Sequence, residues 1–171
     1  MYIRNARIDD RDTLLHIFDS ARRFMQATGN PHQWIDGYPS CELITRDIAQ
    51  GHCYVLEDET AGVTATFSFL PGPDPTYVRI YDGAWPNDRP YGVIHRLASD
   101  GAIKGVAALC FDWCAARCTD LRADTHQDNR VMQHLLKKNG FVPCGTIISA
   151  NGTPRIAFQR SLPATDGRRT S

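Results

Sequence analysis

A run of polar residues, DTHQDN at positions 124–129, joins an alternating segment to a short helical pattern. His126, inside this run, carries a side chain that titrates near neutral pH and therefore suits proton transfer. Asp128 or Asn129 is placed to cap a helix, which Gly140 would end. The apolar residues of this helix recur at helical spacing: Val131, Met132, Leu135 and Leu136. The pattern predicts a turn from a strand into a helix.

Three cysteines form a second suggestive pattern. Cys110, Cys114 and Cys118 are spaced by four residues on one face of a predicted helix, but no CxxC pair accompanies them. The other cysteines are scattered: Cys41, Cys53 and Cys144. We interpret the cysteines as buried, reduced thiols that pack as small hydrophobic groups. A metal site and a nucleophilic cysteine are the alternatives.

The elements that position these residues follow from periodicity. Six segments are rich in strand formers: YIRNAR, HCYVLEDE, GVTATFSFL, YGVIHRLAS, FVPCGTIIS and PRIAFQRSL. A seventh, LRAD, alternates apolar and polar residues as a strand does. A first helix begins near Leu14 and stops before Gly29, and Ser40 caps a second helix. The most regular helical pattern starts at Ile103 and ends at Cys118. The predicted order is strand, helix, helix, three strands, helix, strand, helix and a final hairpin around residues 151–152, which is an α/β fold.

Composition narrows the class of protein. The chain has 171 residues, of which 42% are hydrophobic and 22% charged, which fits a single globular domain over residues 2–162 with a loose tail at 163–171. Nineteen basic residues balance nineteen acidic ones, so neither nucleic acid nor an anionic membrane is an expected partner. No apolar run approaches the roughly 20 residues of a membrane helix, and the N-terminus lacks a signal region. We expect a cytoplasmic protein and leave a homodimer open.

Several of these segments together resemble the GCN5-related N-acetyltransferase (GNAT) family. IHRLAS running into GAIKGVAALC is similar to the family's acetyl-CoA segment, and LLKKNGF is similar to its LYEKxGF ending. The likeness covers about residues 2–162 and implies a mixed, twisted sheet that is splayed between the IHRLAS and LRADTH strands. It also implies that acetyl-CoA is the co-substrate and that no metal takes part.

The resemblance assigns the acetyl-CoA site to the first of these strands and the helix after it. Unpaired backbone N–H groups at a helix N-terminus bind phosphate, and a glycine allows close approach. The implied cofactor residues are Leu97, Ala98, Ser99, Lys104, Gly105, Val106, Ala107, Ala108, Leu109 and Asn129. A backbone N–H near Ala98 would face the thioester carbonyl. Ala107 and Leu109 stand where the family carries glycines, and Asn129 is alternatively a plain helix cap.

Catalysis needs an uncharged amine and a proton for the departing thiolate. The family's usual tyrosine acid is replaced by Leu136, so His126 and His95 are the candidate catalytic groups. Each is alternatively a hydrogen-bonded structural residue. The amine acceptor, a small molecule or a peptide, is expected to meet the loops at residues 29–40 and 75–90. The candidate substrate-binding residues there are Trp34, Tyr38, Tyr81, Asp82 and Trp85, with Asp36 as a further acid, unless the aromatic rings only pin these loops to the core.

The sequence therefore predicts an N-acetyltransferase that works by direct attack of an amine on acetyl-CoA. Three alternatives stay open. The altered glycine pattern and the absent tyrosine fit a catalytically weak acyl-CoA-binding module. An acyltransferase that uses another acyl-CoA is the second. A thiol-dependent hydrolase built on Cys110, Cys114 or Cys144 is the third, although no oriented Cys-His pair is evident in the sequence.

Overall fold

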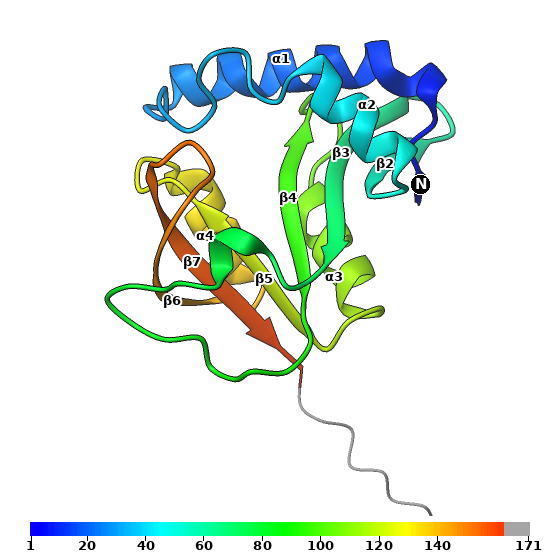
Figure 1. Cartoon of the computed structure of the whole chain (residues 1–171). Coiled ribbons are helices and arrows are strands. Elements are labelled where there is room, and N and C mark those ends of the chain that lie inside the picture. Colours follow the sequence, from blue (N-terminus) through cyan, green and yellow to red (C-terminus); the bar gives the residue numbers. More distant parts are fainter. Residues whose placement is uncertain (163–171) are drawn as a thin grey trace, which may run out of the picture.

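Seven strands form one sheet in the computed structural model, which describes residues 1–162 of the chain (Figure 1). They are β1 (Tyr2–Asn5), β2 (Cys53–Asp58), β3 (Gly62–Pro71), β4 (Gly92–Ser99), β5 (Asp120–Thr125), β6 (Val142–Ile148) and β7 (Pro154–Ser161). Their order across the sheet is β1-β2-β3-β4-β5-β7-β6, and only the β4–β5 pair is parallel. The predicted mixed sheet and order of elements are confirmed. The predicted tail, 163–171, lies outside the described residues.

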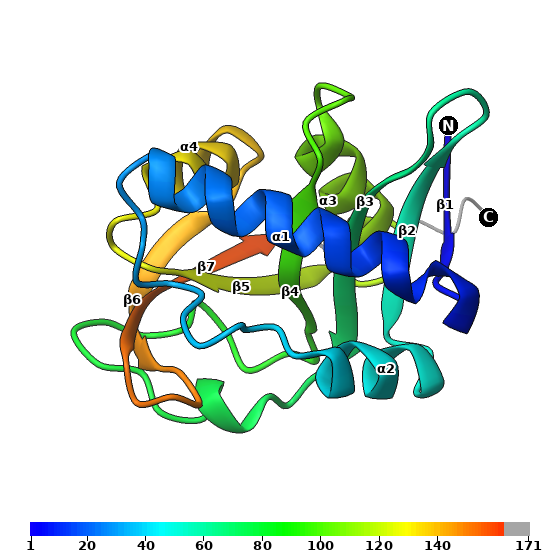
Figure 2. The ribbon, with the colours of Figure 1, turned by 90° about the horizontal axis from the view of Figure 1, so that it is seen from above.

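The helices cover both faces of this sheet (Figure 2). They are α1 (Arg11–Ala27), α2 (Cys41–Ala49), α3 (Val106–Ala115) and α4 (Arg130–Lys138), with short 3₁₀ turns at Ile8–Asp10 and Pro75–Tyr77. Two of them begin with a side-chain cap, because the Ser40 hydroxyl accepts from the N–H of Leu43 and Asn129 Oδ1 accepts from the N–H of Met132. In residues 1–162 no helix combines the length and the apolar character that crossing a bilayer requires.

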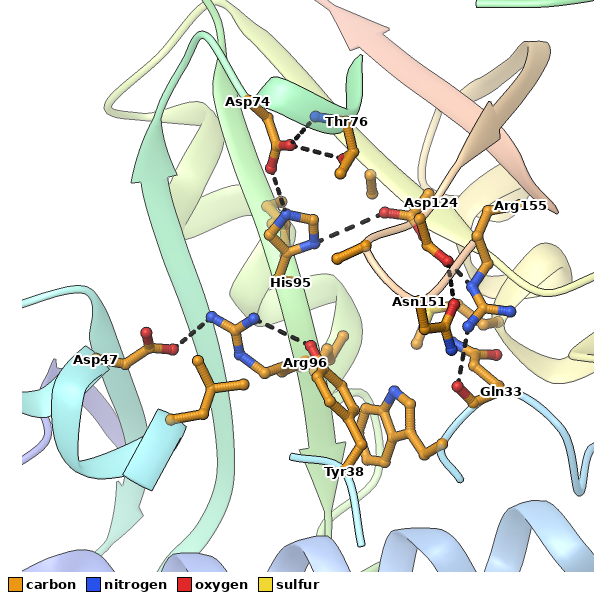
Figure 3. A pocket seen from close by; sticks show the side chains of 18 of the residues that line it. Gln33, Tyr38, Asp47, Asp74, Thr76, His95, Arg96, Asp124, Asn151 and Arg155 are labelled. Carbon is orange, nitrogen blue, oxygen red and sulfur yellow. Dashed lines mark hydrogen bonds and ion pairs between the residues drawn. The ribbon is translucent and has the colours of Figure 1, made fainter. Parts of the chain in front are cut away.

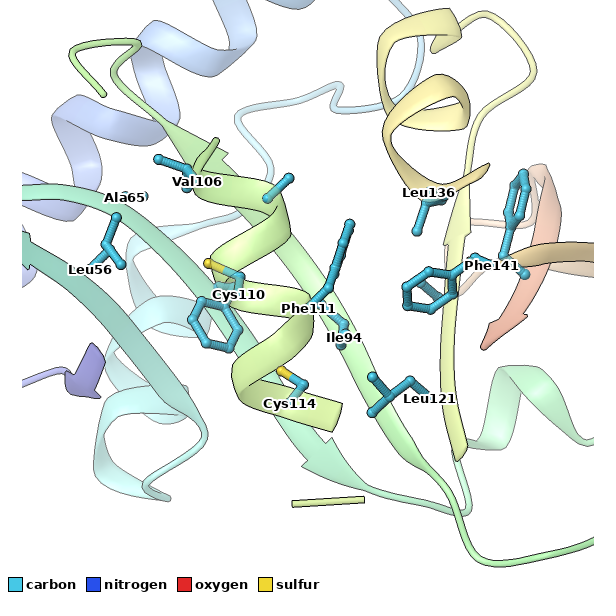
Figure 4. Close-up of a cluster of buried hydrophobic side chains, with 14 residues drawn as sticks. Leu56, Ala65, Ile94, Val106, Cys110, Phe111, Cys114, Leu121, Leu136 and Phe141 are labelled. Atoms are coloured by element: carbon cyan, nitrogen blue, oxygen red, sulfur yellow. The ribbon is translucent and has the colours of Figure 1, made fainter. Parts of the chain in front are cut away.

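The core on one face lies between the sheet and helices α3 and α4 (Figure 4). Its fully buried members include Leu56, Phe67, Cys110, Phe111, Cys114, Leu121, Leu136, Phe141 and Phe158. On the other face, Leu14, Ile17 and Phe18 of α1 and Ile44 of α2 pack on Val55 and Ala98. The segment 72–91 covers the rest of that second face, where Tyr77 packs with Val93, Ile147 and Ala157.

Helix α3 begins three residues later than the periodicity predicts. Gly105 precedes it with φ +80°, a left-handed conformation that interrupts a right-handed helix, so Ile103 lies outside. Helix α3 also ends at Ala115, which leaves Cys118 beyond it. Cys53, Cys110 and Cys114 are buried as predicted, but Cys41 is exposed, because it opens α2 at the surface, and the expectation is wrong there. Within residues 1–162 no three His, Cys, Asp or Glu side chains gather as a metal site.

Candidate active site

The sheet opens between β4 and β5. These strands pair at only two positions, Gly92 with Leu121 and Val93 with Arg122, whereas β4 stays paired with β3 as far as Ser99. The edge of β4 that faces β5 therefore has no strand partner from Ile94 onward in the described chain. The predicted splay between these two strands is confirmed, and it leaves backbone donors and acceptors free inside the molecule.

A β-bulge in β4 lies at this opening. The β3 partners of His95 and Ala98 are Ser68 and Thr66, so β4 contains one more residue than β3 over this stretch. Arg96, within the bulge, has φ +56°, which is uncommon for a residue with a side chain. The bulge places His95 and Arg96, which are neighbours in sequence, along the same cavity.

This cavity has a volume of about 930 Å³ and reaches both faces of the sheet. Apolar side chains line its part near α3 and α4: Ile94, Leu97, Phe111, Met132 and Leu136. The opposite part is polar and contains Asp47, Asp74, His95, Arg96, Asp124 and Arg155, which Figure 3 shows around one space. Trp34 and Tyr38, from the loop between α1 and α2, form an aromatic side of the polar part. The cavity thus joins an apolar compartment to a charged one through the gap in the sheet.

His95 is held between two carboxylates. Its Nε2 lies 2.8 Å from Asp74 Oδ2, and its Nδ1 lies 3.7 Å from Asp124 Oδ1. Burial alone would raise the pKa of Asp74, but hydrogen bonds from His95 and Thr76 outweigh burial and lower the pKa to about 2. Asp74 is therefore ionised at neutral pH and orients the imidazole ring, leaving Nδ1 directed toward Asp124.

A buried tyrosine, Tyr77, holds Asp124 in position through a hydrogen bond. The Tyr77 hydroxyl donates to Asp124 Oδ1 at 2.7 Å, and Tyr77 is only 1% exposed. Burial, and then the negative charge of Asp124, raise the pKa of Tyr77 well above its usual range. Tyr77 therefore stays protonated and acts as a fixed donor, so Asp124 remains an acceptor facing the cavity.

Arg96 is fully engaged by its neighbours. Its Nη2 forms an ion pair with Asp47, its Nη1 donates to the Tyr38 hydroxyl at 3.2 Å, and its Nε donates to the Ser68 hydroxyl at 3.2 Å. Asp47 is itself 4% exposed and also accepts from Ser68. These bonds compensate for the unusual backbone of Arg96 and fix Tyr38 at the cavity.

The start of α3 is a free helix N-terminus. No side chain caps it, unlike α2 and α4, and its first intrahelical bond runs from the N–H of Leu109 to the carbonyl of Gly105 at 3.3 Å. The N–H groups of Val106, Ala107 and Ala108 therefore have no acceptor inside the helix. Lys104 and Gly105 are exposed before them, and a Cβ built on Gly105 would meet no atom within 4 Å. This region fits an anionic group such as a pyrophosphate.

The structure brings together only some of the candidate residues. Trp34, Tyr38, His95, Leu97 and Asn129 line the cavity. Ala98 and Ser99 continue β4 beside it, whereas Leu109 points outward and is 44% exposed. Asn129 uses both ends of its amide within the protein, because Oδ1 caps α4 and Nδ2 donates to Gln33 Oε1 at 2.8 Å. The helix-cap role of Asn129 is thus observed, while its contact with pantetheine stays a prediction.

His126 is not among the residues that line the cavity. Its Nδ1 accepts from the N–H of Asp128 at 3.1 Å, and its side chain is 11% exposed. Burial, and then the charge of Arg155, lower the pKa of His126 below its ordinary 6.5. His126 is therefore hydrogen-bonded as the alternative interpretation expects, His95 is the histidine that lines the cavity, and a catalytic role for either stays a prediction.

Three candidate substrate-binding residues also lie away from the cavity. The bridge between Tyr81 and Thr146 of β6 keeps Tyr81 beside the outer strand, and Asp82 follows it. Trp85 donates from Nε1 to the carbonyl of Tyr77 at 2.9 Å, and the Arg122 guanidinium lies 4.0 Å from its ring centre. The structure places these three residues outside the cavity, with Trp85 packing the segment 72–91 against the sheet, and their part in binding the acceptor stays a prediction.

Five cavity residues were not predicted from the sequence: Asp47, Asp74, Arg96, Asp124 and Arg155. Asp124 offers the clearest signal, since it belongs to the same polar run as His126 and side chains of a strand alternate between the two faces. Arg155 also gives a signal, because it directly precedes the apolar residues Ile156, Ala157 and Phe158 of a predicted strand. Asp47, Asp74 and Arg96 lie in a helix, a proline-rich loop and a bulge, and no local pattern marks them.

Comparison with known proteins supports the resemblance. No family model and no curated protein matches the sequence. Among solved structures, a GNAT-family acetyltransferase from Streptococcus agalactiae is 29% identical with a TM-score of 0.85, over 95% of this chain and 96% of that one. A putative acetyltransferase from Staphylococcus aureus is 25% identical with a TM-score of 0.69, over 95% of this chain and 100% of that one.

A more distant neighbour shares the fold. The phosphinothricin acetyltransferase of Sinorhizobium meliloti, solved in complex with AcCoA, has a TM-score of 0.63 at 17% identity, over 99% of this chain and 91% of that one. The chain has the fold of the GCN5-related N-acetyltransferases over nearly its whole length, and it is an acyltransferase.

Proposed function

We propose that the protein transfers the acetyl group of acetyl-CoA to an amine of a small molecule or peptide by direct attack, with His95 as the proton acceptor. The observation that carries the proposal is the cavity that passes through the gap between β4 and β5 with His95 at its polar side. A through-going cavity allows the acetyl donor and the amine to enter from opposite faces and to meet at the gap. Proximity of this kind is a large part of catalysis.

Acetyl-CoA would be held by backbone groups more than by side chains. The N–H groups of Val106, Ala107 and Ala108 would bind the pyrophosphate, and the free edge of β4 after Val93 would pair with the pantetheine arm. The apolar end of the cavity at Leu97 and Leu136 suits the acetyl group and its sulfur. A backbone N–H near Ala98 would stabilise the oxyanion that forms at the thioester carbon.

The proton balance of the reaction assigns a role to His95. A neutral amine forms the new C–N bond, the C–S bond breaks, and the proton that the amine loses ends on the CoA sulfur. His95, oriented by Asp74 at 2.8 Å, would accept that proton from the attacking nitrogen. Leu136 cannot donate a proton to the sulfur, so the protonated His95 or water would supply it. The mechanism uses no cysteine, since none of the six lines the cavity and Cys110 and Cys114 are fully buried.

Thiol release from acetyl-CoA in the presence of a panel of amines tests the proposal. His95→Gln should lower kcat by about 10²–10⁴-fold, the usual contribution of general acid–base catalysis, without changing the affinity for acetyl-CoA. His126→Gln is the matched control, because His126 follows β5 but does not line the cavity, and it should retain kcat. Acetyl-CoA binding without thiol release for any amine would instead support the acyl-CoA-binding module. Faster thiol release from a longer acyl-CoA than from acetyl-CoA would show that the longer acyl-CoA is the preferred donor.

A further inference from the structure

Arg155, in β7, is a buried cation in the polar part of the cavity. It is 6% exposed, and Figure 3 shows its guanidinium beside Asp124 and the Gln33 backbone. Nη2 donates to the Gln33 carbonyl at 2.9 Å. Nε lies 3.9 Å from Asp124 Oδ2, which is too long for a hydrogen bond, and Nη1 is buried without any partner. Most of the donors of this guanidinium are therefore unused.

Arg96, in the same cavity, does not leave its N–H donors without acceptors as Arg155 does. Both arginines line the same cavity, but each of the three nitrogens of Arg96 has a protein partner, one of them a close carboxylate. The carboxylate nearest to Arg155 belongs to Asp124, which also faces His95. Burial lowers the pKa of Arg155, which is the expected effect of a charge that its surroundings compensate poorly. A buried, unsatisfied donor of this kind is costly unless a ligand completes it.

We infer that the amine acceptor is an α-amino acid, whose carboxylate binds Arg155 while its amino group lies at His95. The inference rests on the proposed function and names its substrate class. Asp124 stands between the two ends of the site, with Oδ1 toward His95 and Oδ2 toward Arg155. An amino group beside Asp124 and a carboxylate at Arg155 match the charges that the cavity presents.

The other charged groups of the cavity agree with this orientation. Asp47 forms an ion pair with Arg96, and Asp74 is hydrogen-bonded to His95 and Thr76, so neither carboxylate is directed at Arg155. Asp36 lies in the exposed loop beside Trp34, and Arg46 is an exposed residue of α2. A peptide carbonyl would satisfy one donor of Arg155 but would bring no charge. A carboxylate supplies a negative charge and two acceptor oxygens, and arginine binds carboxylates through two parallel hydrogen bonds.

Matched acceptors test this class directly. The panel holds the protein amino acids, their carboxamides and the corresponding decarboxylated amines, for example phenylalanine, phenylalaninamide and 2-phenylethylamine. The wild-type protein should acetylate the best amino acid with a kcat/KM about 10- to 100-fold above its carboxamide, as expected for hydrogen bonds to a charged group. Arg155→Gln should remove the difference, and Arg155→Lys should retain part of it. Arg46→Gln, which changes an exposed arginine of the same cavity, should leave it unchanged.

Direct binding separates this inference from the proposed function. Calorimetry with the best amino acid and with its decarboxylated amine, in the absence of acetyl-CoA, should show binding of the first and its loss in Arg155→Gln. Unfolding curves and acetyl-CoA affinity establish that each variant is folded. Equal kcat/KM for amino acids and decarboxylated amines would overturn the amino-acid class while leaving N-acetylation intact. If no amine releases thiol, the proposed function fails, and the calorimetry alone decides whether Arg155 is an anion site.

Discussion

Replacing Gly105 with alanine tests where the protein holds the pyrophosphate of acetyl-CoA. Gly105 has φ +80° at the start of α3, and an added Cβ would meet no protein atom within 4 Å. The only cost to the free protein is the left-handed backbone, about 1–2 kcal/mol for a residue with a side chain. The methyl group would, however, point into the space that the phosphate needs for close approach to the N–H groups of Val106 and Ala107.

A matched variant supplies the control. Gly62 has φ +73°, also meets nothing within 4 Å, and is the first residue of β3, directly after the turn from β2. Gly62→Ala should therefore lower the free energy of unfolding by a similar amount, which corresponds to about 2–4 °C in Tm for each kcal/mol in a chain of this size. Its affinity for CoA should equal that of the wild-type protein.

The expected difference between the two variants is large enough to measure. Loss of one hydrogen bond to a charged phosphate is worth about 1.5–3 kcal/mol, so Gly105→Ala should weaken CoA at least about tenfold. Isothermal titration of CoA gives the affinities, and urea unfolding gives the stabilities. If Gly105→Ala and Gly62→Ala bind CoA equally well, the pyrophosphate does not lie at the start of α3 and this part of the account is wrong.

Two further predictions concern the cysteines and the acid stability. Burial raises the pKa of Cys53 to about 11 and that of Cys110 to about 12; at pH 8 iodoacetamide should therefore label the exposed Cys41 in the native protein and reach Cys53, Cys110 and Cys114 only on unfolding, with activity retained. Loss of activity in step with alkylation of any cysteine would revive the thiol mechanism. Asp74 has its pKa lowered from 3.8 to about 2, so its carboxylate stabilises the folded state above about pH 4 and this contribution is lost as the pH falls through 2. Asp74→Asn should be less stable than the wild-type protein at pH 6, and the gap should close in acid; a gap that is the same at pH 6 and pH 2 would show that the Asp74 charge is not involved.

The order of elements was predictable because it depends on local patterns. Helical spacing, strand-forming runs and capping residues such as Ser40 act over a few positions, and the structure confirms the elements that they predict. The splay between β4 and β5 followed from the resemblance, since no local pattern marks where two distant strands separate. The start of α3 was missed because Gly105 takes a left-handed conformation, which periodicity alone does not show.

The cavity was less predictable because it depends on contacts between distant segments. His95 and His126 are equivalent as titratable side chains, and only the fold shows that one faces the cavity while the other bonds to the backbone of Asp128. Asp74 reaches His95 across 21 positions of sequence. The aromatic segment around Trp85 was assigned to the substrate because loops often carry recognition, but Trp85 packs against Tyr77 and Arg122 instead.

A crystal structure of the protein with bound CoA tests the central claim most directly. The account predicts the pyrophosphate on the N–H groups of Val106 to Ala108, the pantetheine arm between β4 and β5, and the sulfur in the cavity, close enough to His95 for one amine nitrogen to lie between them. CoA bound on another surface, or a sulfur separated from His95 by the sheet, would contradict the proposal that this cavity is where the acetyl group meets its amine.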